Sequence, residues 1–236
     1  MFITFTQTLL TTLVNSAIIA LTGMVNEAGE PMYSKFIVLE ADKRERILNA
    51  ALREFSQKGY KKASTNEIVK YAEISKGLLF HYFSTKKDLF LYLYTYFLNV
   101  FCEEYYKKID PVNKDILLRI KQSSLLKLEI FKVYPLMFKF LYAASVETDN
   151  EVKDDLLKIN TKFKIDSYAK AFTDVDISKF KDGIDIAKAV KLIMWALDGY
   201  ANDVAARYDL RAIDEETFKK IADEIDTYID VLEQCF

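Results

Sequence analysis

Residues 64–90, STNEIVKYAEISKGLLFHYFSTKKDLF, hold the side chains of this sequence that are best suited to bind a nucleic acid. Lysines can pair with phosphate oxygens, and hydroxyl and imidazole groups can donate hydrogen bonds to them. Apolar side chains can contact the methyl groups of thymine in the major groove. The candidate DNA-contacting residues, in chain order, are Thr65, Ser75, Lys76, Gly77, Leu78, Phe80, His81, Tyr82 and Lys86. We expect Leu78 and Phe80 to face the bases, and Thr65, His81, Tyr82 and Lys86 to face phosphates.

Charge is distributed unevenly along the chain. Residues 42–90 carry eleven Lys and Arg against six Asp and Glu, whereas residues 91–236 carry 21 against 26. A basic block followed by an acidic body predicts a polyanion-binding module joined to a part with a different task.

Helix signals place the candidate residues on a helix-turn-helix. From Asp42 an apolar stripe at helical spacing predicts a first helix that ends at Gly59. Ser64 and Glu67 have the spacing of a capping box and predict a short second helix, and Ser75 can cap a short third one. This third helix is the second helix of the helix-turn-helix, the one that enters the major groove.

A further helix comes directly after the motif. Thr85 and Asp88 repeat the capping spacing and predict a long aromatic helix through about Lys108. Leu79 and Phe83 are four residues apart, so we expect them to point inward and to pack in the core rather than toward DNA.

Composition favours an all-α fold. The chain has 236 residues, of which 51% are hydrophobic, and only six are Gly and three Pro. Beyond Pro111 the pattern stays helical, and the last two helices are long and carry broad apolar faces that need a partner to cover them. The predicted division is an N-terminal extension at 1–41, a helix-turn-helix domain at 42–90 and a helical body at 91–236.

The first 25 residues contain no charged side chain, which leaves three interpretations. A secretory signal is disfavoured because no Lys or Arg precedes the apolar run. A membrane anchor is the second interpretation, because the segment is long enough to span a bilayer. The positive-inside rule would then place the body in the cytoplasm. The favoured interpretation is that translation begins at Met32, or that the extension is an appendage outside the fold.

Catalytic and metal-binding patterns are missing from the sequence. His81 is the only histidine, and a single histidine makes neither a hydrolytic triad nor a metal site. Cys102 and Cys235 are far apart and have no neighbouring His, so they predict neither zinc nor a disulfide framework. No Gly-rich phosphate loop or nucleophile elbow is present. We therefore expect no enzyme, no cofactor and no metal.

Residues 42–90 resemble the TetR/AcrR family of transcriptional regulators. The resemblance rests on ILNAALREFSQKGY followed by STNEIVKYAEISKGLLFHYFSTKKDLF. It implies a three-helix DNA-binding head, an all-helical ligand-binding body, and a homodimer held largely by the last two helices. It also implies repression that a small ligand relieves. The residues that match places where the family contacts DNA are Thr65, Lys76, Gly77, Phe80, Tyr82 and Lys86. Leu78 departs from the polar residue sometimes found there, and Glu73 stands where many members have a glycine.

Aromatic residues of the body predict a pocket for a small apolar or aromatic ligand. The candidate lining residues are Phe97, Phe101, Phe131, Phe138, Tyr142, Phe163, Tyr168 and Trp195. Trp195 has an alternative role, because it and its neighbours on the last two helices could be buried in a two-fold dimer interface. The residues for that alternative are Met194, Leu197, Tyr200, Ile221, Ile225, Tyr228, Ile229 and Leu232.

Taken together, these features predict a cytoplasmic, homodimeric regulator that binds operator DNA and, as a repressor, leaves it when a small ligand binds. The alternative is a membrane-tethered helical sensor or binding protein that inserts its apolar N-terminal segment.

Overall fold

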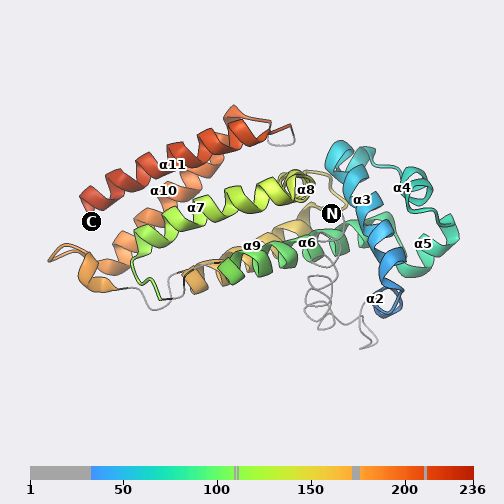
Figure 1. The fold of residues 1–236 in the computed structure, drawn as a ribbon, viewed down its shortest axis with the longest axis horizontal. Coiled ribbons are helices and arrows are strands. Elements are labelled where there is room, and N and C mark those ends of the chain that lie inside the picture. Colours follow the sequence, from blue (N-terminus) through green and yellow to red (C-terminus); the bar gives the residue numbers. More distant parts are fainter. Residues whose placement is uncertain (1–32, 109, 111, 172–175, 210–211) are drawn as a thin grey trace, which may run out of the picture. The chain divides into compact units, whose positions relative to one another are not determined.

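The computed structural model describes residues 33–236, except 109, 111, 172–175 and 210–211. Every regular element among these residues is helical, which confirms the predicted all-α fold (Figure 1). The helices are α2 (Ser34–Ile37), α3 (Ala41–Lys62), α4 (Thr65–Ala72), α5 (Lys76–Tyr82), α6 (Lys86–Lys108), α7 (Ile116–Val133), α8 (Pro135–Ser145), α9 (Lys153–Ala171), the 3-10 helix η1 (Ile177–Lys179), α10 (Ile186–Arg207) and α11 (Glu215–Cys235).

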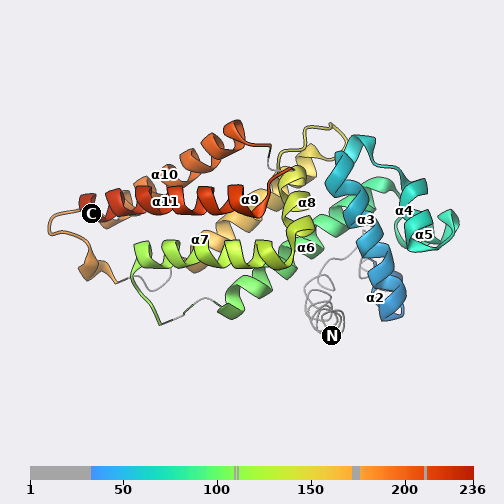
Figure 2. The same ribbon diagram turned by 45° about the horizontal axis from the view of Figure 1, so that its top comes forward.

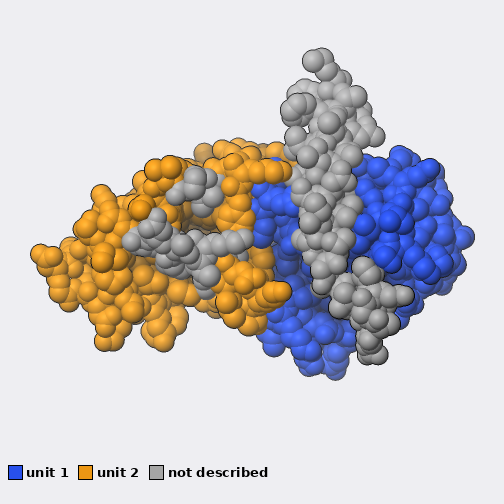
Figure 3. Space-filling view, turned by 90° about the horizontal axis from the view of Figure 1, so that it is seen from below, with its two compact units in different colours: residues 1–104, 136–160 blue, residues 105–135, 161–236 orange. Residues whose placement is uncertain are grey.

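The chain divides into two compact units, drawn in blue and orange in Figure 3. Unit 1 extends to Glu104 and includes Leu136–Asn160, and unit 2 comprises Tyr105–Pro135 and Thr161–Phe236. Unit 1 contains the predicted head and continues past residue 90 into α6, α8 and the start of α9.

In unit 1, α4 and α5 lie to one side of α3 (Figures 1 and 2). The apolar stripe predicted for α3 is buried, and so are Leu79 and Phe83, as their spacing predicted. The ring centroid of Phe90 lies 4.9 Å from that of Phe55 and 5.6 Å from that of Phe140. These aromatic contacts join α3, α6 and α8 into one core, because edge-to-face packing adds to the burial of apolar surface.

Helix α2 belongs to this core although it precedes the predicted boundary at residue 42. Phe36 is fully buried. The guanidinium of Arg44 is also buried, and its Nη1 donates to the carbonyl oxygens of Ile37 at 2.7 Å and Leu39 at 3.2 Å. The extension predicted for residues 1–41 therefore contributes to the head from Tyr33 onward.

Gly59 breaks the helical run of α3. Its φ of 66° and ψ of −176° are non-helical, and a second, short helical stretch follows it and continues to Lys62. The helix that begins at Ala41 therefore stops at Gly59, as the sequence predicted. The backbone at this position has a positive φ, which residues with a side chain rarely adopt, so a substitution of Gly59 would be strained.

Glu73 follows α4 in the left-handed conformation, with φ 54° and ψ 47°. This conformation costs a non-glycine residue about 1 kcal/mol. We expect Glu73→Gly to raise the free energy of unfolding by roughly 0.5–1 kcal/mol, measured by urea denaturation.

The matched control for this prediction is Glu73→Ala. Both variants lose the exposed ion pair with Arg46, in which Nη1 lies 3.3 Å from the Glu73 carboxylate. Only the alanine variant keeps the Cβ that makes the conformation costly. Equal stability of the two variants would show that the turn stores no strain.

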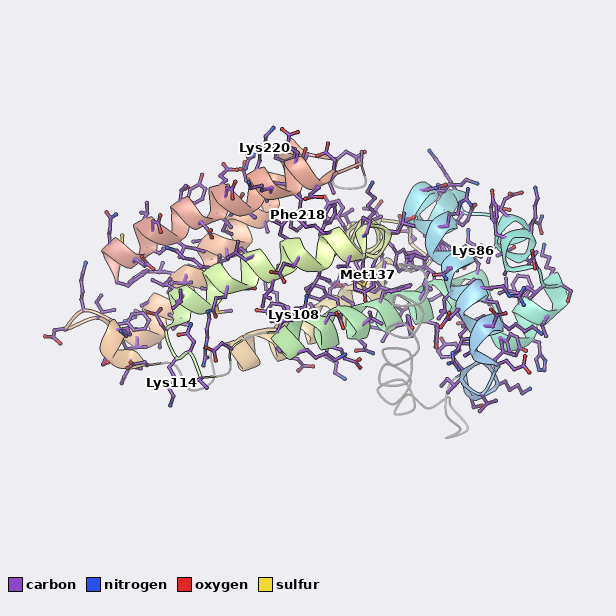
Figure 4. The ribbon with its side chains drawn as sticks, viewed as in Figure 1. Lys86, Lys108, Lys114, Met137, Phe218 and Lys220 are labelled. Atoms are coloured by element: carbon purple, nitrogen blue, oxygen red, sulfur yellow. The ribbon has the colours of Figure 1, made fainter. Side chains whose placement is uncertain are left out.

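Unit 2 is built from helices that run alongside one another, including α7, α10 and α11 (Figure 1). Its core cluster consists of Ile116, Leu117, Phe180, Ala189, Ile193 and Ile229. Phe131 of α7 stacks on Phe218 of α11, with ring centroids 4.5 Å apart, and Lys132 pairs with Glu215 at 3.1 Å (Figure 4 labels Phe218).

Within the part of the chain that the structure describes, no helix combines the length and apolar character needed to cross a membrane. The apolar segment 1–25, for which an anchor was one interpretation, lies outside the described residues.

Candidate nucleic-acid interface

The start of α4 is fixed by two different acceptors. The Ser64 hydroxyl accepts the amide hydrogen of Glu67 at 3.5 Å, as the capping spacing predicted. The reciprocal bond is different, because the Ser64 amide donates to Glu54 Oε1 at 2.8 Å rather than to Glu67. The predicted capping box is therefore only half formed, and a carboxylate from α3 completes it. Thr65, the first residue of α4, is half-buried beside this cap.

Glu54 is a buried carboxylate, with 3% of the residue exposed. In addition to the Ser64 amide it binds Lys58, whose Nζ lies 2.9 Å from Oε1. Both bonds go to the same oxygen. Glu54 thus connects the middle of α3 to the first turn of α4, and no local pattern in the sequence indicates this link.

The turn between α4 and α5 is held from α3. Nη1 of Arg46 donates to the carbonyl oxygen of Ala72 at 3.0 Å. Since only residues 73–75 separate the two helices, this bond helps to set the angle at which α5 leaves α4. The arrangement is the predicted helix-turn-helix.

Helix α5 presents its N-terminal turn to solvent. Its cap is the Ser75 hydroxyl, which accepts the Leu78 amide hydrogen at 3.1 Å. Lys76 and Gly77 are exposed, and a Cβ placed on Gly77 would meet no atom within 4 Å. A DNA backbone or base edge could therefore approach this turn closely.

The remaining candidates on α5 are arranged around its second half. Leu78, Phe80 and Tyr82 are half-buried and His81 is exposed, whereas Leu79 is buried in the core. Thus Ser75, Lys76, Gly77 and His81 lie in the open, and Leu78, Phe80 and Tyr82 each keep part of their surface accessible. The structure brings the α5 candidates together on one short helix, and their contacts with DNA stay a prediction.

Lys86 stands apart from the other candidates because its ammonium is engaged within the protein (Figure 4). Nζ donates to the carbonyl oxygens of Tyr60 at 2.9 Å, and of Lys61 and Ala63 at 3.4 Å each. It also lies 4.5 Å from the centroid of the Tyr60 ring. Lys86 therefore satisfies carbonyls at the end of α3, and a contact with phosphate stays a prediction for it.

Helix α6 begins with the reciprocal cap that the spacing of Thr85 and Asp88 predicted. The Thr85 amide and hydroxyl donate to Asp88 Oδ2 at 3.0 and 2.8 Å, and the Asp88 amide donates to Thr85 Oγ1 at 3.0 Å. This cap fixes the residue that precedes Lys86.

The predicted pocket residues are divided between the two units. Unit 1 contains Phe97, Phe101, Phe138 and Tyr142, and unit 2 contains Phe131, Phe163, Tyr168 and Trp195. The rings of Phe101 and Phe138 meet edge to face at 5.5 Å. Trp195 is 59% exposed, and the side chain of Tyr168 lies outside the described residues. The pocket stays a prediction.

Three tyrosines in the aromatic run of residues 90–101 lie in the core of unit 1. Tyr92, Tyr94 and Tyr96 are all buried, and burial raises the pKa of each hydroxyl above its ordinary value. The Tyr94 hydroxyl donates to the side-chain oxygen of Asn160. Because aromatic residues occur on several faces of this helix, the sequence pattern alone does not indicate which faces are buried.

Comparisons with known proteins agree on the head. Residues 47–93 match the model of a family described as bacterial regulatory proteins, tetR family. Over 48 residues the chain is 46% identical to the HTH-type transcriptional regulator QacR of Staphylococcus aureus, covering 20% of this chain and 26% of QacR. Over 56 residues it is 41% identical to the HTH-type transcriptional regulator YuxN of Bacillus subtilis, covering 24% of this chain and 19% of YuxN.

A solved structure extends the likeness to the fold. A TetR-like transcriptional regulator from Rhodococcus sp. RHA1 superimposes with a TM-score of 0.56 over 83% of this chain and 94% of that one, at 20% identity. Residues 47–93 of the head match the tetR-family model, which confirms the resemblance noted in the sequence. The sequence matches span only about a quarter or less of QacR and YuxN.

Proposed function

We propose that the chain is a sequence-specific, DNA-binding transcriptional regulator that does not act as an enzyme. The observation that carries the proposal is the capped first turn of α5, where Lys76 and Gly77 are exposed at the start of the second helix of a helix-turn-helix. A lysine there can reach base edges or phosphates, and the glycine leaves room for the groove wall. The uneven charge of the chain supports the proposal, because the head supplies the attraction for phosphate.

The active form in this proposal is a homodimer that pairs two copies of α10 and α11. Large apolar side chains are exposed on both helices, among them Leu192 and Trp195 on α10, and Tyr228 and Val231 on α11. Covering them in a two-fold contact would remove apolar surface from water and place two heads on one duplex. Half-sites one helical turn apart would suit such a dimer.

The proposed regulator is a cytoplasmic repressor. It leaves its operator DNA when a small ligand binds. A ligand can shift the equilibrium only if it prefers the conformation that does not fit the operator. The aromatic residues predicted for the pocket suit an apolar or aromatic compound.

The test begins with selection of binding sites from a random-sequence pool of duplex DNA by the parent protein. We expect one sequence class to be enriched. Lys76→Gln should weaken binding to it about tenfold and change the sequence that the variant itself selects, because a contact at the start of α5 is lost. Affinity is measured by fluorescence anisotropy of the labelled duplex.

Lys158→Gln is the matched control, since it makes the same charge change on an exposed side chain of α9. It should retain the parent's affinity and sequence preference. Failure of the parent to enrich any sequence would contradict the proposal, as would equal effects of the two substitutions.

A further inference from the structure

Phe36 of α2 is fully buried and touches the end of the recognition helix α5. Its ring meets that of Tyr82 at 5.8 Å between centroids, with an angle of 64° between the planes. It also packs on Phe83 at 4.7 Å and on Tyr92 at 5.3 Å. Phe36 thus connects a segment that precedes the helix-turn-helix to one of the candidate DNA-contacting residues.

Helix α2 is held in place at both of its ends. At its C-terminal end the buried Arg44 guanidinium binds the carbonyl oxygens of Ile37 and Leu39. At its N-terminal end the ring of Tyr33 lies 4.8 Å from that of Tyr92, and its hydroxyl donates to the Asp88 carbonyl at 3.5 Å. Because α2 has only four residues, these anchors rather than its own hydrogen bonds keep Phe36 in position.

Tyr82 is the last residue of α5 and is half-buried. Its ring meets that of Phe36 edge to face, and on the same helix the His81 ring approaches it at 5.6 Å. The next residue, Phe83, is buried and fixes the backbone. A tyrosine side chain has few rotamers, so contact with one rigid neighbour is enough to select the direction of its hydroxyl.

We propose that Phe36 is a positioning residue that holds the Tyr82 ring so that its hydroxyl donates to a DNA phosphate. The inference rests on the proposed function, because it concerns the same interface. Phe36 itself is buried and does not reach DNA. Its contribution to affinity is therefore expected to act entirely through the hydroxyl of Tyr82.

This dependence gives a test by double-mutant cycle. Phe36→Leu removes the aromatic ring that contacts Tyr82, Tyr82→Phe removes the hydroxyl and keeps the ring, and the third variant combines both. The probe is the labelled duplex selected by the parent protein. We expect each single variant to lose about tenfold in affinity, the size of one hydrogen bond to a charged group. The double variant should bind as weakly as Tyr82→Phe alone and no weaker.

Phe55→Leu is the control for a general loss of core packing. Phe55 is also fully buried in the head, but its ring contacts are with Phe90 and Phe140 and not with α5. It should lower the midpoint of thermal unfolding, as Phe36→Leu does, while leaving DNA affinity close to the parent's at a temperature where all variants are folded. Should Phe36→Leu fail to fold, Phe36→Met takes its place in the cycle, because the unbranched methionine side chain adapts better to an irregular space.

The inference is overturned if Phe36→Leu leaves affinity unchanged, or if it weakens binding as much in the Tyr82→Phe background as in the parent. Equal losses for Phe36→Leu and Phe55→Leu would also overturn it. These outcomes differ from failure of the proposed function, in which the parent protein itself selects no duplex.

Discussion

Replacing Glu54 with alanine is expected to lower the free energy of unfolding by about 3 kcal/mol. The carboxylate is buried, and it accepts one hydrogen bond from the Ser64 amide and one from the Lys58 ammonium. Its removal leaves the Ser64 N–H without this acceptor at the start of α4, and an unsatisfied buried donor costs about 1–3 kcal/mol. The lost packing of the side chain adds to this.

The control for Glu54 is its partner Lys58. The Lys58 side chain is 43% exposed, so Lys58→Met should destabilise the protein clearly less than Glu54→Ala does. Glu54→Gln is expected to fall between the two, because an amide oxygen can still accept the Ser64 hydrogen. Urea denaturation followed by circular dichroism measures all three. If Glu54→Ala costs no more than Lys58→Met, the carboxylate does not hold the start of α4.

Replacing Glu147 with alanine is expected to cost about 2 kcal/mol and to expose the amide of Tyr60 to exchange. Oε2 of Glu147 accepts that amide at 3.0 Å, across 87 residues of sequence. Oε1 accepts the amides of Thr148 and Asp149 at 2.9 and 3.1 Å. One carboxylate thus orders the turn after α8 and joins it to the residue that follows Gly59.

Amide hydrogen exchange distinguishes this joint from a general loss of stability. Protection of the Tyr60 amide should fall in Glu147→Ala by a larger factor than protection of amides in the middle of α6. Asp154→Asn removes the same charge from an exposed position in the first turn of α9 and should leave Tyr60 protected. Equal loss of protection across the head would contradict a local role for Glu147.

Much of the head could be predicted because its signals are local. Caps depend on residues three positions apart, and the Thr85–Asp88 pair formed both of the reciprocal bonds from backbone amide to side chain, as expected. The same spacing at Ser64 and Glu67 produced only one bond, because Glu54 from the preceding helix competes for the Ser64 amide. Periodicity cannot reveal such a competitor, since it depends on how two helices pack.

Contacts between distant segments account for the features that could not be predicted. Phe36 lies 46 residues before Tyr82 and Glu147 lies 87 after Tyr60, so neither pairing leaves a periodic trace. The exposure of Lys76 and Gly77 on α5 was easier to predict, because it follows from helical phase alone. The environment of Lys86 was harder to predict. Its charge indicated a contact with DNA phosphate, whereas in the folded chain its ammonium donates to three carbonyl oxygens.

The position of the Lys86 ammonium has a mechanical consequence. Lys86 opens α6, and the carbonyls that it binds belong to the end of α3 and to Ala63, two residues before α4 begins. The first turn of α6 and the entry to α4 are thereby joined at a single point. A rotation of the first turn of α6 must therefore either move Thr65 as well or break the hydrogen bonds of the Lys86 ammonium. A displacement of the first turn of α6 would thus be passed through these bonds to the segment that leads into α4.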